Sequence, residues 1–348
     1  MADAVQNMNT EEYRRRNPSR SLEEIIELMK EHGIKFEICP EQEAIRRLKR
    51  NNYFRLSSYK CNYVEGNTPS KYANLDFAYL YDLSKVDTKL RKMILELCIN
   101  FEHEFKTQLK QYLDDNDDGY SAVSSFLSHQ TDLSDSHRDT ALIDGFIKKL
   151  ETPFLKNIVK DDVLVDPDHP EWFLQTCPYW IFTELLDFGK LIDFYEFIFY
   201  PENWRKEPME KPISKGKNEV GELHKIRELR NACAHNNCII ASLVPEKTSG
   251  KDFLFLTKDV QAWLDKKKDG DFHFSKNMKK VPVLNRLINL FYWIDKIVPE
   301  KKKLEVLQVF CDDLDTITDH KDYYAGNDYI CNAYNFLLGL TKKLLTSG

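Results

Sequence analysis

The sequence predicts an all-α, mainly helical protein. Its 348 residues include only 12 glycines and 13 prolines, too few for the many turns of an all-β protein. Apolar residues recur three or four positions apart along several long stretches, which is the spacing of one helix face. Because 42% of the residues are hydrophobic, the chain can bury a substantial core.

The first sixty residues predict a loose arm followed by two short helices. Residues 1–20 are polar and are expected to form the arm. Ser21 and Glu24 have the spacing of a capping box, in which each side chain bonds the backbone N–H of the other residue. The helix that they start is expected to end at His32–Gly33, and a second helix starts near Pro40.

Residues 41–60 mix basic and aromatic side chains, with six Lys or Arg residues against two Glu residues. Basic groups can follow a phosphate backbone, and aromatic rings can stack on unpaired bases. We therefore predict RNA contacts by Arg46, Arg47, Lys49, Arg50, Tyr53, Arg55 and Lys60. The alternative is that the aromatic rings belong to the core and that the basic groups form a solvated face.

The rest of the chain predicts helices joined by polar breaks. A long helix, or a pair of helices, is predicted over residues 75–113, and the polar run 114–119 ends it. Residues 201–217, with three prolines and many charges, are expected to form a connector, and 252–257 a short strand. Further helices are predicted over residues 136–160, 179–200, 219–236, 283–297 and, as one or two helices, 304–345.

The helix predicted over 219–236 ends in the segment RNACAH, which contains the candidate catalytic residues Arg230, Asn231 and His235. A histidine can transfer a proton near neutral pH. An arginine is always charged, and its planar guanidinium matches a phosphate. An asparagine can orient the arginine or hold a phosphate oxygen by hydrogen bonds. These three side chains together are suited to metal-free cleavage of RNA.

The spacing of the motif raises a difficulty. Arg230 and His235 are five positions apart, which places them roughly 140° apart around a regular helix. They can converge if the helix tightens or frays near His235, or if two copies of the motif meet in a dimer. The alternative is a helix end at Asn236–Asn237 whose Arg and His make ordinary surface or capping contacts.

The segment 230–235 resembles the RNxxxH motif of HEPN-domain ribonucleases. Three further stretches, in the order of the family, resemble its Abi-like (abortive infection) branch of bacterial proteins: 44–59, 76–104 and 178–191. The resemblance covers roughly residues 20–240.

This resemblance implies a division of the chain as well as a fold. It implies a HEPN-like helical bundle over residues 71–240, preceded by a helical, basic-aromatic region over 21–70. A helical C-terminal region over 241–348 completes the chain. It also implies a homodimer and an acidic residue near the arginine, for which Glu102 is the candidate. Some HEPN toxins have a tyrosine two positions after the histidine, where this chain has Asn237, so control through that tyrosine is not expected.

We therefore expect a metal-independent endoribonuclease of abortive-infection defence, or a toxin. One alternative is a non-catalytic RNA-binding scaffold that binds, for example, a small regulatory RNA. Another is a DNA-binding regulator that uses the helices of residues 21–60.

Composition limits the other function classes. The net charge of −6 argues that any RNA surface is local. None of the eight cysteines forms a C-x2-C pair, so we expect neither a metal nor a cofactor. No run of 18 apolar residues and no secretory signal occurs, so a cytoplasmic protein without a membrane span is expected.

Overall fold

The computed structural model describes residues 18–64, 72, 74–115, 119–132, 177–200, 219–246, 255–268 and 272–346, with isolated positions at 12, 14, 15, 145, 146, 148 and 149. Over these residues the fold is all α, as predicted, and contains no strand, only two isolated β-bridges. The predicted connector over 201–217 and most of the predicted helix over 136–160 lie outside the described residues. Of the predicted strand, residues 255–257 are described and are not in a strand.

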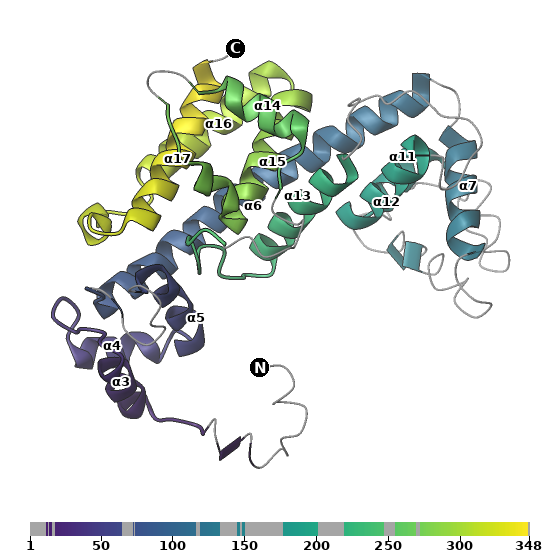
Figure 1. The fold of residues 1–348 in the computed structure, drawn as a ribbon. Coiled ribbons are helices and arrows are strands. Elements are labelled where there is room, and N and C mark those ends of the chain that lie inside the picture. Colours follow the sequence, from purple (N-terminus) through teal and green to yellow (C-terminus); the bar gives the residue numbers. More distant parts are fainter. Residues whose placement is uncertain are drawn as a thin grey trace.

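The helices fall into three consecutive groups (Figure 1). The first group comprises α3 (Leu22–Glu31), α4 (Glu41–Leu48), α5 (Tyr53–Ser58) and the 3-10 helix η1 (Tyr59–Tyr63). The second comprises α6 (Phe77–Asp115), α7 (Gly119–Asp132), α11 (Tyr179–Leu185), α12 (Phe188–Phe199) and α13 (Glu219–Ala234). The third comprises α14 (Lys258–Lys266), η4 (Lys276–Lys280), α15 (Pro282–Ile297), α16 (Glu300–Asp315), η5 (Lys321–Tyr324) and α17 (Asp328–Thr346).

The predicted start and end of α3 are both confirmed. Ser21 and Glu24 form the capping box, with the Glu24 N–H donating to Ser21 Oγ at 3.2 Å and the Ser21 N–H donating to Glu24 Oε2 at 2.6 Å. Gly33 follows the helix with a φ of 82°, a conformation that glycine adopts without steric cost. The chain then turns back toward α4.

Helix α6 is the element on which the three groups meet. It is one continuous helix of 39 residues, about 58 Å long at 1.5 Å per residue. Its start is capped by Asp76, whose Oδ1 accepts from the Ala78 N–H at 2.8 Å. The other oxygen, Oδ2, accepts from the N–H groups of Glu37 and Ile38 at 2.8 and 3.1 Å. Asp76 thereby ties the segment after α3 to the first turn of α6.

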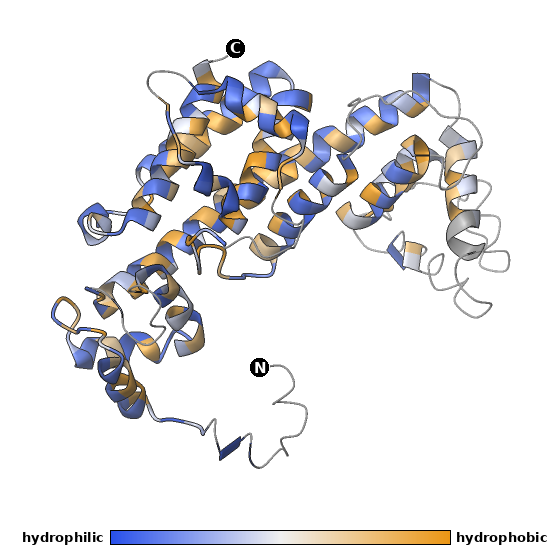
Figure 2. Ribbon diagram, viewed as in Figure 1, coloured by the Kyte–Doolittle hydropathy of each residue, from blue (hydrophilic) through white to orange (hydrophobic). Residues whose placement is uncertain are grey.

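The core lies where α6 contacts α12 and α15. Trp293 of α15 is fully buried and lies 6.2 Å from Phe101 and 6.3 Å from Phe105, measured between ring centroids. Phe188 of α12 packs edge-on against the same two phenylalanines, and Tyr195 of α12 packs in a tilted arrangement against Phe105. Figure 2 shows apolar residues concentrated where α6, α13 and α15 face one another. Burial of such large rings is the main stabilising contribution to a helical core.

The prediction of one helix over 179–200 is wrong, because the chain forms α11 and α12 there. Leu186 has an extended backbone, with a ψ of 130°. Asp187 then caps α12 by accepting a hydrogen bond from the Lys190 N–H at 3.0 Å. Both helices contact α6.

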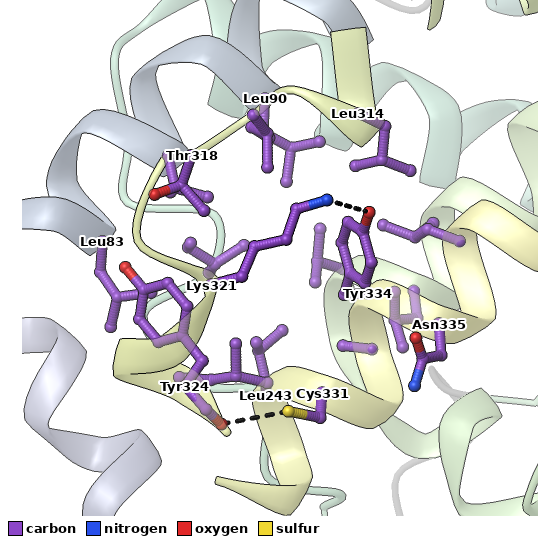
Figure 3. A pocket seen from close by; sticks show the side chains of 18 of the residues that line it. Leu83, Leu90, Leu243, Leu314, Thr318, Lys321, Tyr324, Cys331, Tyr334 and Asn335 are labelled. Atoms are coloured by element: carbon purple, nitrogen blue, oxygen red, sulfur yellow. Dashed lines mark hydrogen bonds between the residues drawn. The ribbon is translucent and has the colours of Figure 1, made fainter. Parts of the chain in front are cut away.

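The C-terminal helices and α6 line an apolar pocket that is partly open to solvent (Figure 3). Over residues 304–345, where the sequence predicts one or two helices, the chain forms two, α16 and α17, which pack against each other. Lys321 is one of the residues that line the pocket, and its Nζ donates a hydrogen bond to the hydroxyl of Tyr334 at 3.4 Å. No helix in the described part of the chain has both the length and the apolarity to cross a membrane.

Candidate active site

The motif helix α13 is held at its N-terminal end by buried carboxylates. Glu219 accepts a hydrogen bond from the Tyr195 hydroxyl at 2.7 Å, and Glu222 accepts from Trp293 Nε1 at 2.9 Å. Both glutamates lie in the first turn, where the helix dipole favours negative charge. These contacts fix α13 against α12 and α15, while its other end carries the RNACAH segment.

The C-terminal end of α13 is a Schellman turn. The Asn237 N–H donates to the Ala232 carbonyl at 2.9 Å, and the Asn236 N–H donates to the Cys233 carbonyl at 3.2 Å. Asn236 has a φ of 60°, the left-handed conformation that this turn requires. The regular helix therefore ends at Ala234, and His235 is the first residue after it.

Arg230, Asn231 and His235 line one hollow of about 1000 Å³ that is open to solvent. His235 is exposed, whereas the side chain of Arg230 is 34% exposed. Arg230 and His235 both line this hollow despite the separation of about 140° expected on a regular helix, because the hollow is broad and His235 lies beyond the last regular turn. The remaining lining residues are Asp187, Phe188, Gly189, Arg227, Glu228, Ala232 and Asn237.

The guanidinium of Arg230 has N–H donors that are not used in hydrogen bonds within the described part of the protein. Its Nη1 donates to Asn231 Oδ1 at 3.2 Å, so the asparagine orients the arginine. Its Nε is buried, makes no hydrogen bond, and lies 3.8 Å from Glu102 Oε2. A guanidinium carries five N–H donors, so this arrangement leaves capacity for phosphate oxygens.

Glu102 of α6, the candidate for the acidic residue that the resemblance implies near the arginine, has its Oε2 3.8 Å from Arg230 Nε. Its side chain is 16% exposed and also forms an ion pair with Lys106, whose Nζ lies 3.7 Å from Glu102 Oε1. This position suits a group that holds the arginine electrostatically. The structure gives no contact between Glu102 and His235, and Glu102 is not among the residues that line the hollow.

The seven residues predicted to bind RNA have different surroundings. Arg46, Lys49 and Arg50 are exposed, although Arg46 also pairs with Glu43 at 2.5 Å. The other four make contacts within the protein. Arg47 bonds Glu43 and lies over the ring of Tyr81, and Lys60 lies over the ring of Tyr72. Tyr53 packs against the core, and Arg55 contacts the end of α13. Among these seven residues, the three that are open to solvent lie at the C-terminal end of α4 or directly after it.

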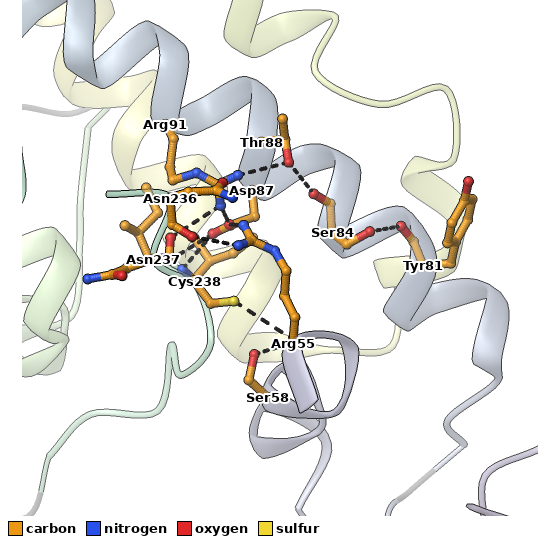
Figure 4. A network of polar contacts seen from close by, with 12 residues as sticks. Arg55, Ser58, Tyr81, Ser84, Asp87, Thr88, Arg91, Asn236, Asn237 and Cys238 are labelled. Carbon is orange, nitrogen blue, oxygen red and sulfur yellow. Dashed lines mark hydrogen bonds and ion pairs between the residues drawn. The ribbon is translucent and has the colours of Figure 1, made fainter. Parts of the chain in front are cut away.

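Arg55 connects the N-terminal helices to the motif (Figure 4). Its Nη1 donates to the Asn236 carbonyl at 2.5 Å, and its Nη2 lies 3.4 Å from Asp87 Oδ2. The preceding residue, Phe54, has a side chain that is 81% exposed. Of the three aromatic residues of this region, only Phe54 is open to solvent, because Tyr59 is fully buried and Tyr53 is half-buried.

Two sets of site residues were not predicted from the sequence. Arg227 lines the hollow together with Arg230. The signal available was its spacing, because residues three apart on a helix are neighbours. Asp87 and Arg91 of α6 hold the end of the motif helix, and their signal was the i, i+4 spacing of an acid and an arginine.

The cysteines beside the motif, Cys233 and Cys238, are free thiols. All eight cysteines are described and free, and Cys233 is buried while Cys238 is half-buried. Burial raises the pKa of the Cys233 thiol to about 12. Because the thiolate is the reactive form, this thiol is inert at neutral pH. Among the described residues, no group of three or more His, Cys, Asp or Glu side chains is placed to hold a metal ion.

Comparison with known proteins identifies the family of the chain. The profile of the Abi-like protein family matches residues 46–241, a stretch that contains α6, the hollow and the Schellman turn. No curated protein and no solved structure gave a match. Because the matched stretch covers more than half of the 348 residues, the chain belongs to the family of Abi-like proteins.

Proposed function

We propose that this Abi-like protein is a metal-independent endoribonuclease that acts in abortive-infection defence against phage, or as a toxin. The observation that carries the proposal is the shared hollow of Arg230, Asn231 and His235. It supports RNA as substrate because the hollow offers a phosphate-binding cation beside a proton-transfer group. The resemblance of RNACAH to the HEPN motif supports the same reaction.

In this reaction the 2′-hydroxyl of the substrate attacks the adjacent phosphorus. A bond from O2′ to phosphorus forms, the bond from phosphorus to O5′ breaks, and the products carry a 2′,3′-cyclic phosphate and a 5′-hydroxyl. His235 takes or delivers a proton, and Arg230 stabilises the negative charge on the pentavalent phosphate. Asn231 keeps the guanidinium in place through the hydrogen bond to Nη1. Glu102 balances the charge of the arginine from the side of α6.

The reaction needs a base and an acid, and His235 is the only histidine that lines the hollow among the described residues. We propose that a two-fold homodimer supplies the second group by bringing two motifs together. The same observation favours the second candidate, a non-catalytic scaffold that binds RNA such as a small regulatory RNA. In that case the exposed basic side chains of α4 carry the function, and Arg230 and His235 are structural.

The test compares purified wild type with Arg230→Ala and His235→Ala on total cellular RNA in EDTA, followed by mapping of the 3′ ends. We expect cleavage by wild type that leaves cyclic phosphates and spares DNA. Each substitution is expected to lower the rate by about 10²- to 10³-fold. His273→Ala is the matched control, because His273 is exposed and does not line the hollow.

Two results would count against the enzyme. Cleavage that requires a divalent metal would contradict the mechanism. Absence of cleavage by every variant, with folding and RNA binding intact, would favour the scaffold. Expression of the same variants in phage-infected cells then distinguishes a scaffold from an enzyme that is silent until it is triggered.

A further inference from the structure

Asp87 is a buried carboxylate at the centre of a network that reaches the motif (Figure 4). It lies in the N-terminal third of α6, and its side chain is 0% exposed. Oδ1 accepts hydrogen bonds from the N–H groups of Ile239 and Ile240 at 2.9 and 3.0 Å. Oδ2 forms an ion pair with Arg91 one helical turn along and a longer contact with Arg55.

The two arginines continue from this carboxylate to the backbone after His235. Arg55 donates to the Asn236 carbonyl at 2.5 Å, and Arg91 donates to the Asn237 carbonyl at 3.2 Å. Together with the bonds from Asp87, this network contacts the backbone of residues 236, 237, 239 and 240. Arg91 is itself held by Thr88, whose hydroxyl accepts from Nη2 at 2.9 Å.

Stability alone does not explain this arrangement. Desolvation of buried charges offsets much of their attraction, so a buried ion pair can often be replaced by apolar residues without loss of stability. The network instead fixes the position of one short segment, because its bonds are made to specific N–H and carbonyl groups of that segment. That segment begins with Asn236, whose left-handed conformation sets the course of the chain after His235.

We propose that Asp87, Arg91 and Arg55 are positioning residues that hold the segment after the motif helix so that His235 faces the hollow beside Arg230. Their role in catalysis rests on the ribonuclease activity proposed above. Arg55 belongs to α5, so the N-terminal helices take part in the geometry of the site. Loss of the network leaves Arg230 and Asn231 in place, because both lie within α13.

The decisive variant is Asp87→Asn, which keeps the shape of the side chain and removes its charge. We expect kcat to fall by about 10²-fold, since a displaced catalytic group costs that much, while KM stays within about twofold. Asp82→Asn is the matched control. Asp82 is a buried carboxylate of the same helix, but its partners are Thr318 and Tyr324 of the C-terminal region. This control is expected to keep the wild-type kcat.

Arg55→Ala tests the same idea with little risk to folding, because this side chain is 25% exposed and the Asp87–Arg91 pair remains. We expect a fall in kcat in the same direction as for Asp87→Asn. Arg55→Lys keeps the charge but loses the planar fork, and it should restore kcat only in part. A rise in KM with unchanged kcat would instead identify Arg55 as an RNA ligand and overturn its positioning role.

Amide hydrogen exchange separates this inference from the ribonuclease proposal. In Asp87→Asn, we expect faster exchange at the amides of Ile239 and Ile240, and in Asp82→Asn no change there. That result supports the positioning network even if wild type cleaves no RNA. Wild-type kcat together with unchanged protection in Asp87→Asn would overturn the inference.

Discussion

At the residue scale, the hollow presents two arginines whose surroundings differ. Arg230 faces Glu102 and is oriented by Asn231. Arg227 lies one turn earlier, against the start of α12, where a Cβ added at Gly189 would come within 3.3 Å of its Nη1. The missing side chain of Gly189 therefore leaves room for the guanidinium of Arg227 at the edge of the hollow.

This difference predicts different kinetic effects for the two arginines. Arg227→Ala should weaken RNA binding on all sequences and lower the slope of log K against log salt by about 1, as for the loss of one phosphate contact. Its kcat should fall much less than that of Arg230→Ala. RNA titrations at several salt concentrations measure the slope, with Lys301→Ala, an exposed site outside the hollow, as control. An unchanged slope would remove Arg227 from the binding surface.

At the element scale, α13 and α15 are joined through Glu222, which is buried and accepts from Trp293 Nε1 and from the hydroxyl of Thr257. Burial raises the pKa of Glu222 above its ordinary value, more than the two hydrogen bonds lower it. A carboxyl with a raised pKa binds its proton more tightly in the folded state. It therefore contributes stability at low pH that is lost as pH rises through its folded pKa.

Glu222→Gln should remove this dependence. A glutamine can accept from Trp293 and donate to the Thr257 oxygen, so the contacts are kept without the charge. We expect the stability of the variant relative to wild type to increase from about pH 5 to pH 8, because only wild type loses stability through this group. Urea unfolding at several pH values measures the difference. A difference that shrinks with rising pH would show that the pKa of Glu222 is not raised.

Two helical glycines provide a second test at this scale. In α13, a Cβ added at Gly221 would meet nothing within 4 Å, whereas at Gly339 of α17 it would lie 2.5 Å from the ring of Phe272. Gly221→Ala should raise the free energy of unfolding by about 0.5–1 kcal/mol through helix propensity. Gly339→Ala should lower it, because Phe272 is buried and has little room to move. Stabilisation by both substitutions, measured by urea unfolding, would contradict this packing.

At the scale of the whole molecule, features that are local in the sequence could be predicted and those created by packing could not. The helical character and the end of α6 follow from periodicity and the polar run after it, and the caps of α3 follow from short-range signals, although the sequence left open whether α6 is one helix or two. The break at Leu186 was missed because apolar residues continue across it, although Asp187 supplied a cap signal. Arg230, Asn231 and His235 lie within six residues. The Arg55 contact with Asn236 spans 181 positions, so no sequence pattern revealed it.

The last prediction concerns assembly, because His235 is the only histidine lining the hollow among the described residues. If two motifs from a homodimer complete the site, an excess of His235→Ala chains should suppress wild-type RNA cleavage by forming mixed dimers with one histidine. Specific activity per wild-type chain should also fall on dilution through the dissociation constant of the dimer. The measurement is cleavage rate against variant concentration, with the same excess of albumin as control. A rate that depends only on the wild-type concentration would mean that one chain carries the whole site, and that a group other than a second His235 supplies the other proton transfer.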